Sequence, residues 1–331
     1  MKEFELIELL TRGVDRSAAD LAAGVGDDCA VIAGPAGRQW LVTTDLLVEG
    51  VHFNLDYTDL ATLGRKALSV NLSDIAAMGG VPRFWLSSVA IPQKVGPDGA
   101  GALYRGMRGI ADEHGALLIG GDTSASDKGL LISVTAVGEC AAGRAILRSG
   151  AKTGDAIYVT GELGGSALGL LLQKNGMKDG DASRFIRRHN DPAVRVKEAR
   201  LLSAGGAITS MIDVSDGLMA DLGHIADASG AGFEINAWRV SADPSLPALA
   251  AQLKADPMDL ILAGGEDYEL AFTVAESRAL EFERETVPGT GLSVTRIGTI
   301  LRDRAVRRAK LADGSEVVMK MAGFDHFGGR S

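Results

Sequence analysis

The chain has 331 residues, 46% of them hydrophobic, which is enough apolar material for the cores of two ordinary domains. Its net charge of −9 and its lack of a lysine- and arginine-rich block exclude a surface that follows a phosphate backbone, so we expect no nucleic-acid partner. No segment approaches the roughly 20 apolar residues of a membrane span, and the N-terminal sequence MKEFELIELL carries acids where a signal peptide would be basic. We therefore expect a cytoplasmic protein without a membrane partner.

The predicted elements of the first half alternate between β-branched apolar runs and helical patterns. In chain order they are strand 38–45, helix 58–80, strand 85–92, helix 97–115, strand 116–124 and strand 130–139. The first helix begins at the capping residue Thr58 or Asp59 and contains Asp74. The first strand is expected to stop at Asp45, and the third to run into a Gly-Gly-Asp turn.

A loop-like segment, 140–155, separates the two halves, and we place the domain boundary there, which gives domains 1–140 and 141–331. The second half repeats the style of the first. Its predicted elements are strand 156–161, a helix within 164–173, helix 191–206 with Pro192 in its first turn, strand 207–217, helix 218–230, strand 266–274, helix 275–286, strand 293–300 and a hairpin around 313–314. This alternation predicts an α/β fold in which helices cover sheets.

Carboxylates recur beside glycine, serine and threonine at the predicted ends of strands and starts of helices. They are Asp27, Asp28, Asp45, Asp74, Asp122, Asp213 and Asp216. Each alone is an ordinary turn or cap residue, but together they match the oxygen ligands that Mg²⁺ prefers. Two unit charges ~4 Å apart repel by roughly 4 kcal/mol at an effective dielectric near 20, so convergence of these side chains would require metal ions.

Cys29 and Cys140 are the only cysteines, so neither a disulfide framework nor a cysteine-based zinc site is expected.

The common nucleotide-binding motifs do not occur in the sequence. There is no Gly-Lys dipeptide and therefore no P-loop, each G-x-G lacks the third glycine of the dinucleotide fingerprint, and the protein-kinase motifs HRD and DFG are missing. An acidic site can hold a nucleoside triphosphate only through bridging cations. A phosphotransferase of another kind is the remaining enzymatic interpretation.

Seven motifs, in order and over nearly the whole chain, resemble the thiamine-monophosphate kinase family, which belongs to the superfamily typified by aminoimidazole ribonucleotide synthetase. They are GVGDDCAVI (24–32), TTDLLVEGVHF (43–53), KALSVNLSDIAAMGGVP (66–82), LIGGDTS (118–124), LRSGAKTGDAIYVTG (147–161), MIDVSDGLMADLGHIADASG (211–230) and GGEDYELAFT (264–273). The resemblance implies an α/β (α+β), two-domain, PurM-like architecture of mixed sheets covered by helices. It also implies a homodimer in which the N-terminal sheets pair.

The resemblance further implies phosphorylation of thiamine monophosphate to thiamine diphosphate, the last step of thiamine diphosphate biosynthesis, with ATP as co-substrate and two or more Mg²⁺ ions. By position, the magnesium ligands would be Asp28, Thr43, Thr44, Asp45, Asp74, Asp122, Asp213 and Asp216. The ATP contacts would be Tyr104, Gly121, Asp122, Arg148 and Ser215. The thiamine moiety would be held by His52, Glu266 and Phe324.

Several of these residues also fit simple structural roles. His52 fits a packed or capping imidazole, Tyr104 a core position, Glu266 a cap and Phe324 an anchor for the C-terminal tail. Arg148 fits a surface residue of the linker, although its guanidinium can clamp a phosphate bidentately and stabilise developing charge.

Phosphoryl transfer requires alignment and charge neutralisation, and the acceptor phosphate is already nucleophilic. The sequence therefore fits direct in-line attack on the γ-phosphorus of ATP, with no general base and no phospho-enzyme.

Two alternative functions stay open. One is a sister ATP-dependent enzyme that acts on a formamidine ribonucleotide, selenide or a carbamoylated maturation partner, and the other is a non-catalytic sensor of nucleotide or metal. The N-terminal cysteine loop of a selenophosphate synthetase is absent, because the first cysteine is Cys29.

Overall fold

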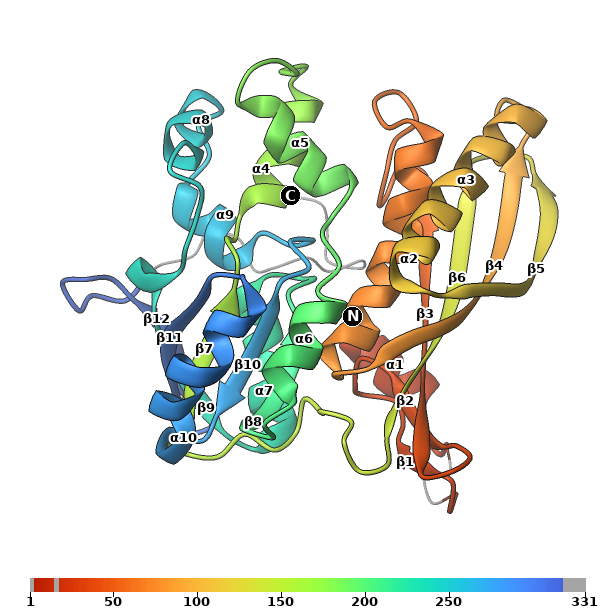
Figure 1. Ribbon diagram of the computed structural model, residues 1–331. Helices are drawn as coiled ribbons and strands as arrows, with labels where there is room; N and C mark the ends of the chain where they lie inside the picture. The colour runs from red at the N-terminus through yellow and green to blue at the C-terminus, as the bar shows by residue number, and fades with distance from the viewer. Residues whose placement is uncertain (1–2, 15–17, 318–331) are drawn as a thin grey trace.

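The computed structural model describes residues 3–14 and 18–317. Two domains lie side by side, each built on a six-stranded mixed sheet, and helix α2 (Leu60–Ala77) runs between them (Figure 1). This arrangement confirms the predicted α/β class of mixed sheets covered by helices. In the described part of the chain, no helix is long and apolar enough to cross a bilayer.

The N-terminal sheet has the strand order β1-β2-β3-β6-β4-β5, antiparallel throughout except for the parallel edge pair β4–β5. Its strands are β1 (Leu21–Ala23), β2 (Ala30–Ala33), β3 (Arg38–Val48), β4 (Val81–Pro92), β5 (Leu117–Ser126) and β6 (Leu131–Ala141). Its helices are α1 (Glu3–Leu10), α2 and α3 (Gly96–His114). Helices α2 and α3 pack on the sheet around one core that includes Leu68, Trp85 and Met107.

Two acids that were predicted to end strands lie inside them, so these two predictions are wrong. Strand β3 continues past Asp45 to Val48, and β5 continues through Asp122 to Ser126. In each case the neighbouring strand keeps pairing beyond the acid, β6 with β3 and β4 with β5, which satisfies the backbone hydrogen bonds. The predicted strand 207–217 ends earlier than expected, at Asp213, the first of its two acids.

The C-terminal sheet has the order β12-β9-β11-β7-β10-β8, with only the edge pair β12–β9 parallel. Its strands are β7 (Ala156–Thr160), β8 (Ile208–Asp213), β9 (Gly232–Asn236), β10 (Leu270–Val274), β11 (Val294–Leu301) and β12 (Arg307–Lys310). The α-helices are α4 (Gly165–Lys174), α5 (Ala182–Asn190), α6 (Val196–Ser203), α7 (Leu218–Ser229), α8 (Leu246–Gln252), α9 (Pro257–Ala263) and α10 (Glu276–Glu281). Shorter turns are the 3₁₀ segments Ala237–Arg239 and Val287–Thr290 and the π segment Phe282–Thr286.

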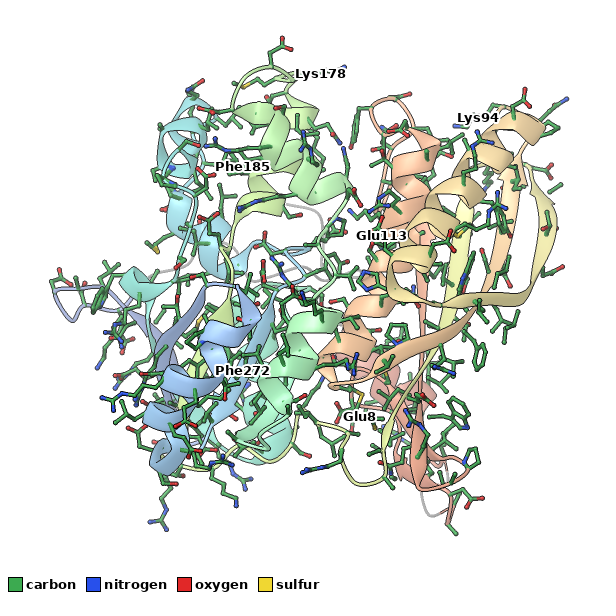
Figure 2. The ribbon with its side chains drawn as sticks, viewed as in Figure 1. Glu8, Lys94, Glu113, Lys178, Phe185 and Phe272 are labelled. Atoms are coloured by element: carbon green, nitrogen blue, oxygen red, sulfur yellow. The ribbon has the colours of Figure 1, made fainter. Side chains whose placement is uncertain are left out.

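This second sheet is covered on both faces. One face packs against α4, α7 and α9, and the other packs against α6, α10 and the end of α2. On the latter face Phe272, labelled in Figure 2, stacks on Tyr158 with ring centroids 5.5 Å apart. Phe282 meets both rings edge-on.

The predicted helix 191–206 is shorter and later than expected. It starts at Val196, and Pro192 lies in a non-helical link after α5 rather than in a first helical turn. Asp191, the residue before the proline, has φ −139° and ψ 72°, as expected because proline disfavours the α conformation in the residue that precedes it. The sequence analysis did not anticipate α1, α5, α8, α9, β1, β2 or β9.

Helix α2 joins the two domains. It crosses α3 at two glycines: a Cβ on Gly64 would lie 2.0 Å from the Leu103 carbonyl oxygen, and one on Gly106 would lie 1.9 Å from that of Ala61. Near its C-terminus the fully buried Ala76 and Ala77 belong to the core of the other domain. Helix α2 therefore contributes residues to both cores, and its polar side chains, Asp74 among them, lie at the boundary between the domains.

Candidate active site

Three carboxylates from both domains meet at the domain boundary. Asp28 precedes β2, Asp74 lies on α2 and Asp213 ends β8, and one oxygen of each lies within 4.8 Å of the others. The side chain of Asp28 is fully buried and Asp213 is 2% exposed. The structure thus brings together acids that are 46 and 139 residues apart in the sequence (74 − 28 and 213 − 74).

Neighbouring side chains fix the orientation of two of these carboxylates. The Ser73 hydroxyl donates to Asp213 Oδ2 over 2.6 Å, and the Thr43 hydroxyl donates to Asp74 Oδ2. Both donors lie close in the sequence to acids of the site, Ser73 next to Asp74 on α2 and Thr43 two residues before Asp45 on β3. Each hydroxyl therefore orients a carboxylate through a hydrogen bond.

Arg148 supplies a positive charge at the edge of the cluster. Its Nε and Nη2 donate to Asp28 Oδ1 over 3.1 and 2.5 Å, and its backbone N–H donates to Asp27. The other oxygen of Asp28, Oδ2, is buried and has no hydrogen-bond partner. An orphaned carboxylate oxygen facing two further acids is an incomplete site, and a cation would complete it.

Burial and mutual repulsion raise the pKa values of these acids. Burial, with the charge of Asp28 adding to it, raises the pKa of Asp213 to about 7, and burial raises that of Asp45 to about 6. Burial followed by the charges of Asp45 and Asp213 raises the pKa of Asp74 as well. Without a cation the cluster therefore retains protons near neutral pH.

Two predicted metal ligands lie elsewhere in the described protomer. The Thr44 hydroxyl is on the opposite face of β3, donates to the Val134 carbonyl and accepts from Thr135, both over 3.1 Å. Asp122 lies on β5 at the exposed edge of the sheet. Strands β6 and β4 separate β5 from β3, so the two acids Asp45 and Asp122 are about three strand spacings, or roughly 14 Å, apart.

The predicted ATP contacts are distributed over several elements. Ser215 lies two residues after the end of β8, on the loop that precedes α7. Gly121 precedes Asp122 on the edge strand, and Tyr104 on α3 packs, partly buried, against the N-terminal core. The structure therefore does not bring Tyr104 and Gly121 to the acidic cluster of the same protomer.

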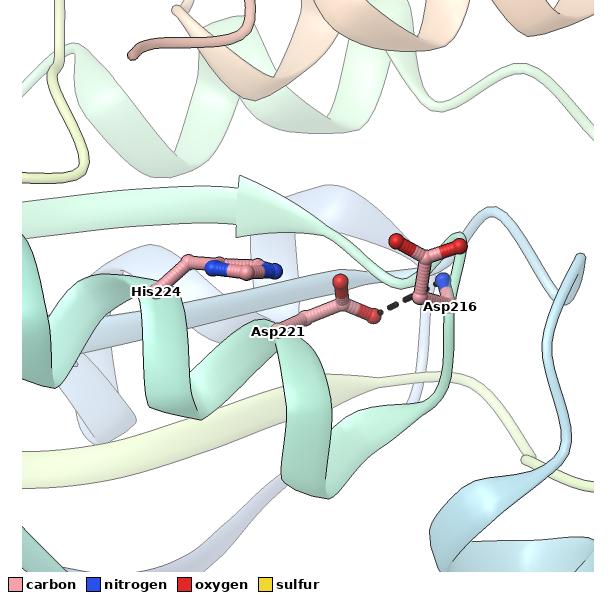
Figure 3. Close-up of side chains that lie close together, drawn as sticks. All are labelled: Asp216, Asp221 and His224. Carbon is pink, nitrogen blue, oxygen red and sulfur yellow. Dashed lines mark hydrogen bonds between the residues drawn. The ribbon is translucent and has the colours of Figure 1, made fainter. Parts of the chain in front are cut away.

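The start of α7 carries a second group of metal-ligand side chains. Ligand atoms of Asp216, Asp221 and His224 all lie within 4.8 Å of one another (Figure 3). The Asp221 carboxylate accepts from the backbone N–H groups of Ser215, Asp216 and Gly217 over 3.1 to 3.2 Å. It thereby holds the loop that presents Asp216. The sequence analysis missed Asp221 and His224, although their i, i+3 spacing on a predicted helix places them on one face.

The residues predicted to bind thiamine lie at the other end of α2. Glu266 Oε1 is 3.0 Å from Lys66 Nζ and its Oε2 is 3.2 Å from His189 Nδ1. Burial favours the neutral acid, but Lys66, His189 and His52 outweigh it, so the pKa of Glu266 lies below its usual value. The Nδ1 of His52 accepts from the Val48 N–H over 2.9 Å, which leaves the proton of its neutral ring on Nε2.

The structure brings His52 and Glu266, from different domains, close enough to interact. Phe324, the third predicted thiamine contact, lies outside the described residues. Sequence reasoning did not single out Lys66 or His189, because a lysine in a helix and a lone histidine carry no local signal of burial.

Known proteins resemble this chain in sequence over nearly its full length. The family models for the N-terminal and C-terminal domains of AIR synthase related proteins match residues 26–140 and 152–309. The thiamine-monophosphate kinase of Bacillus subtilis (strain 168) is 38% identical over 332 residues, covering 99% of this chain and 100% of the relative. That of Salmonella typhimurium is 37% identical, with 98% of each chain covered.

Solved structures agree with the sequence relatives. The structure of AaThiL complexed with AMPPCP and TMP superposes with a TM-score of 0.84 at 31% identity, covering 98% of this chain and 97% of that one. The thiamine-monophosphate kinase of Stenotrophomonas maltophilia K279a gives a TM-score of 0.76 at 34% identity, with 91% and 93% covered. Both the family resemblance carried by the seven sequence motifs and the two-domain PurM-like architecture are confirmed, and the chain belongs to the thiamine-monophosphate kinase family.

Proposed function

We propose that this protein transfers the γ-phosphoryl group of ATP to thiamine monophosphate and so forms thiamine diphosphate and ADP. The observation that carries this proposal is the buried group Asp28, Asp74 and Asp213 at the domain boundary. Acids in this arrangement can receive polyanionic substrates only together with cations. The names of the relatives, and the relative whose structure holds TMP and the ATP analogue AMPPCP, support both substrates.

Two or more Mg²⁺ ions fit this donor set. The ligands would be Asp28, Asp45, Asp74 and Asp213, with Asp216 from the loop before α7, and the orphaned Asp28 Oδ2 is the oxygen that most requires a cation. When bound, magnesium neutralises phosphate charge and aligns donor and acceptor oxygens. Thr43 contributes by holding Asp74, whereas the side-chain position of Thr44 does not support its predicted ligand role.

The chain's own residues hold the reacting groups in place. Arg148 stands at the cluster with a guanidinium that can exchange its contact with Asp28 for a phosphate oxygen. Ser215, on the loop held by Asp221, lies where a nucleotide phosphate would approach Asp213. Since the acceptor phosphate is already ionised, transfer needs alignment and no general base.

The acceptor would lie along α2, between Glu266 and the acidic cluster. Lys66, which contacts Glu266, precedes Asp74 by eight residues (74 − 66), or about 12 Å at 1.5 Å per residue. A substrate with an organic base at one end and a phosphate at the other can span this distance. Glu266 and His52 would bind the thiamine moiety, and a contact from Phe324 stays a prediction.

The protein would act as a homodimer paired through its N-terminal sheets. Strand β5 is an exposed edge, and its residues Leu117, Leu118 and Ile119 are 63%, 44% and 55% exposed. An apolar edge strand of this kind requires a cover, and a second copy would supply it. Gly121 and Asp122 would then lie at the subunit interface, where Tyr104 on the neighbouring helix α3 is also a candidate nucleotide contact.

The domain boundary after residue 140 and the cytoplasmic location remain predictions.

The decisive experiment measures ADP release from Mg-ATP by the purified protein with thiamine monophosphate, with thiamine or without acceptor. We expect turnover only with the monophosphate, and thiamine diphosphate as the product identified by mass. ATP binding without turnover on thiamine monophosphate would contradict the proposal and would favour a sister activity or a sensor.

A further inference from the structure

A buried ion pair crosses the domain boundary at the acceptor end of α2. Lys66, on a helix of the N-terminal domain, is 2% exposed, and its Nζ lies 3.0 Å from Glu266 Oε1 in a loop of the C-terminal domain. On the other side of the carboxylate, His189 Nδ1 of α5 lies 3.2 Å from Oε2 and 3.0 Å from the Ser166 hydroxyl. Glu266 is therefore held from two directions by two elements.

The two partners differ in charge. Burial, followed by the charge of Lys66, lowers the pKa of His189 to about 3, so its ring is neutral under working conditions. Its Nδ1 lies within reach of both the Ser166 hydroxyl and Glu266 Oε2. Lys66 supplies the positive charge that balances the Glu266 carboxylate. The other titratable groups that face Glu266 are His52 and Tyr268.

The carboxylate still has room for a ligand. An ionised carboxylate has about four lone-pair positions, and Lys66 and His189 each approach only one of its two oxygens. The Glu266 side chain is 27% exposed, in contrast to both of its partners. The carboxylate is therefore accessible to a ligand.

The backbone of this loop is held in an unfavourable conformation. Glu266 and Tyr268 have φ values of +65° and +50°, a region that residues with side chains rarely adopt. The loop is tied to the segment after β8 by two hydrogen bonds, Glu266 N–H to Ser215 O over 2.7 Å and Tyr268 N–H to Val214 O over 2.9 Å. Strain of this kind persists where the surrounding structure imposes it, and the two hydrogen bonds hold the loop in the conformation in which Glu266 meets Lys66.

We propose that Lys66 is a positioning residue for acceptor binding: together with His189 it holds the Glu266 carboxylate across the domain boundary, oriented to accept hydrogen bonds from the amino-substituted heterocycle of the acceptor. This inference rests on the proposed function. It assigns to Lys66 and His189 a role in selecting an N–H-donating organic base, while the phosphate end is bound elsewhere on α2.

The test substitutes Lys66→Met, which keeps the length and apolar stem of the side chain and removes its charge. We expect the KM for thiamine monophosphate to rise about tenfold or more, because one partner of a buried charged pair is lost, with a much smaller fall in kcat and an unchanged KM for ATP. Lys66→Arg should recover part of the acceptor affinity. Calorimetric titration with thiamine monophosphate should show the same loss in Kd.

Arg65→Met provides the matched control. Arg65 is the adjacent residue of α2 and also crosses the boundary, with Nε 2.9 Å from Asp191 Oδ1 and Nη1 2.8 Å from Glu113 on α3, whose labelled side chain faces the gap in Figure 2. Its ion-pair partners in the described residues are Glu113 and Asp191 rather than Glu266, so its loss should leave the KM for thiamine monophosphate unchanged. An equal rise in both variants would show a general effect of domain docking and would overturn the inference.

Two further measurements separate the possible failures. In a Glu266→Gln background, Lys66→Met should add little to the loss of acceptor affinity, since both changes disable the same group; full additivity would overturn the inference. If Lys66→Met does not fold, Lys66→Gln, which keeps an amide donor, should still raise the KM severalfold, and an unchanged KM would again overturn it. A wild-type protein that turns over thiamine monophosphate while the Lys66 variants bind it normally would refute only this inference, whereas an inactive wild type would refute the proposed function.

Discussion

The carboxylate of Asp213 belongs to the second domain, yet it faces two acids of the first. In Asp213→Asn, the amide keeps the size of the side chain and its contact with Ser73 but loses the negative charge that a divalent cation requires. We expect kcat to fall by at least about 100-fold, the scale on which loss of a single charge-stabilising group acts in other enzymes. Steady-state assays under saturating Mg-ATP would measure it.

Asp227→Asn is the matched control for this prediction. Asp227 is an exposed acid paired with Arg307 at the far end of α7, so its amide variant should keep normal turnover. A folded Asp213→Asn protein with near-normal kcat would show that the cluster does not hold the catalytic metals.

The raised pKa of Asp213, about 7 against its ordinary 3.8, predicts how stability depends on pH. Between these values the folded protein binds more protons than the unfolded chain, so the free energy of unfolding of the metal-free protein should fall as pH rises from 4 to 7. Magnesium should remove this dependence, because it replaces the protons. Thermal melts in EDTA and in magnesium at several pH values would test this, with Asp213→Asn as the variant in which the metal-free slope is reduced. A metal-free protein that becomes more stable across this range would contradict the prediction.

The crossing of α2 and α3 depends on glycine. In Gly106→Ala the new Cβ would lie 1.9 Å from the Ala61 carbonyl oxygen, so the helices must separate, and we expect a destabilisation of about 2 kcal/mol or more. Gly101→Ala in the same helix meets only the end of the Arg105 side chain at 3.4 Å, and should be neutral or stabilising by about 0.5 kcal/mol because alanine favours helix. Urea denaturation of both variants would measure the difference, and equal stabilities would contradict the close crossing.

Several elements could be predicted from the sequence, and the exceptions have physical reasons. Helix α2 was located within three residues at each end because its apolar periodicity and its cap at Asp59 are local signals. The continuation of β3 beyond Asp45 depends on pairing with β6, 86 residues later at its first residue (131 − 45), which no local pattern contains. The loop around Glu266 was read as strand because its alternating residues gave no sign of two positive φ values.

The candidate site shows the same division. The sequence motifs were sufficient to propose that Asp28, Asp74 and Asp213 meet. These motifs occur in the same order as in the family, so they identify the acids even though the residues are far apart in the sequence. The side chains that orient them or Glu266, such as Asp221 and Lys66, were missed because burial and partner choice arise only when the two domains pack together.

At the scale of the whole molecule, the exposed apolar strand β5 predicts the oligomeric state. In the double variant Leu117→Glu and Ile119→Glu, negative charges would lie on the proposed subunit interface, and sedimentation should change from a dimer to a monomer. Leu280→Glu on α10, an equally exposed position (59%), should remain dimeric. A monomeric wild type, or a dimer insensitive to the β5 changes, would contradict pairing through this strand.

Helix α2 packs mainly in the core of the first domain but ends in the core of the second, so the boundary in the sequence is not a boundary in folding. A fragment ending near residue 140 would expose Ala76 and Ala77, and a fragment starting there would lose the surface that covers β8 and α6. Each half is consequently a scaffold for the other, and heating should melt them in one cooperative transition. Exchanging one half of the chain for a foreign domain would therefore also require a matching change in helix α2, because its last turn lies in the core of the second half.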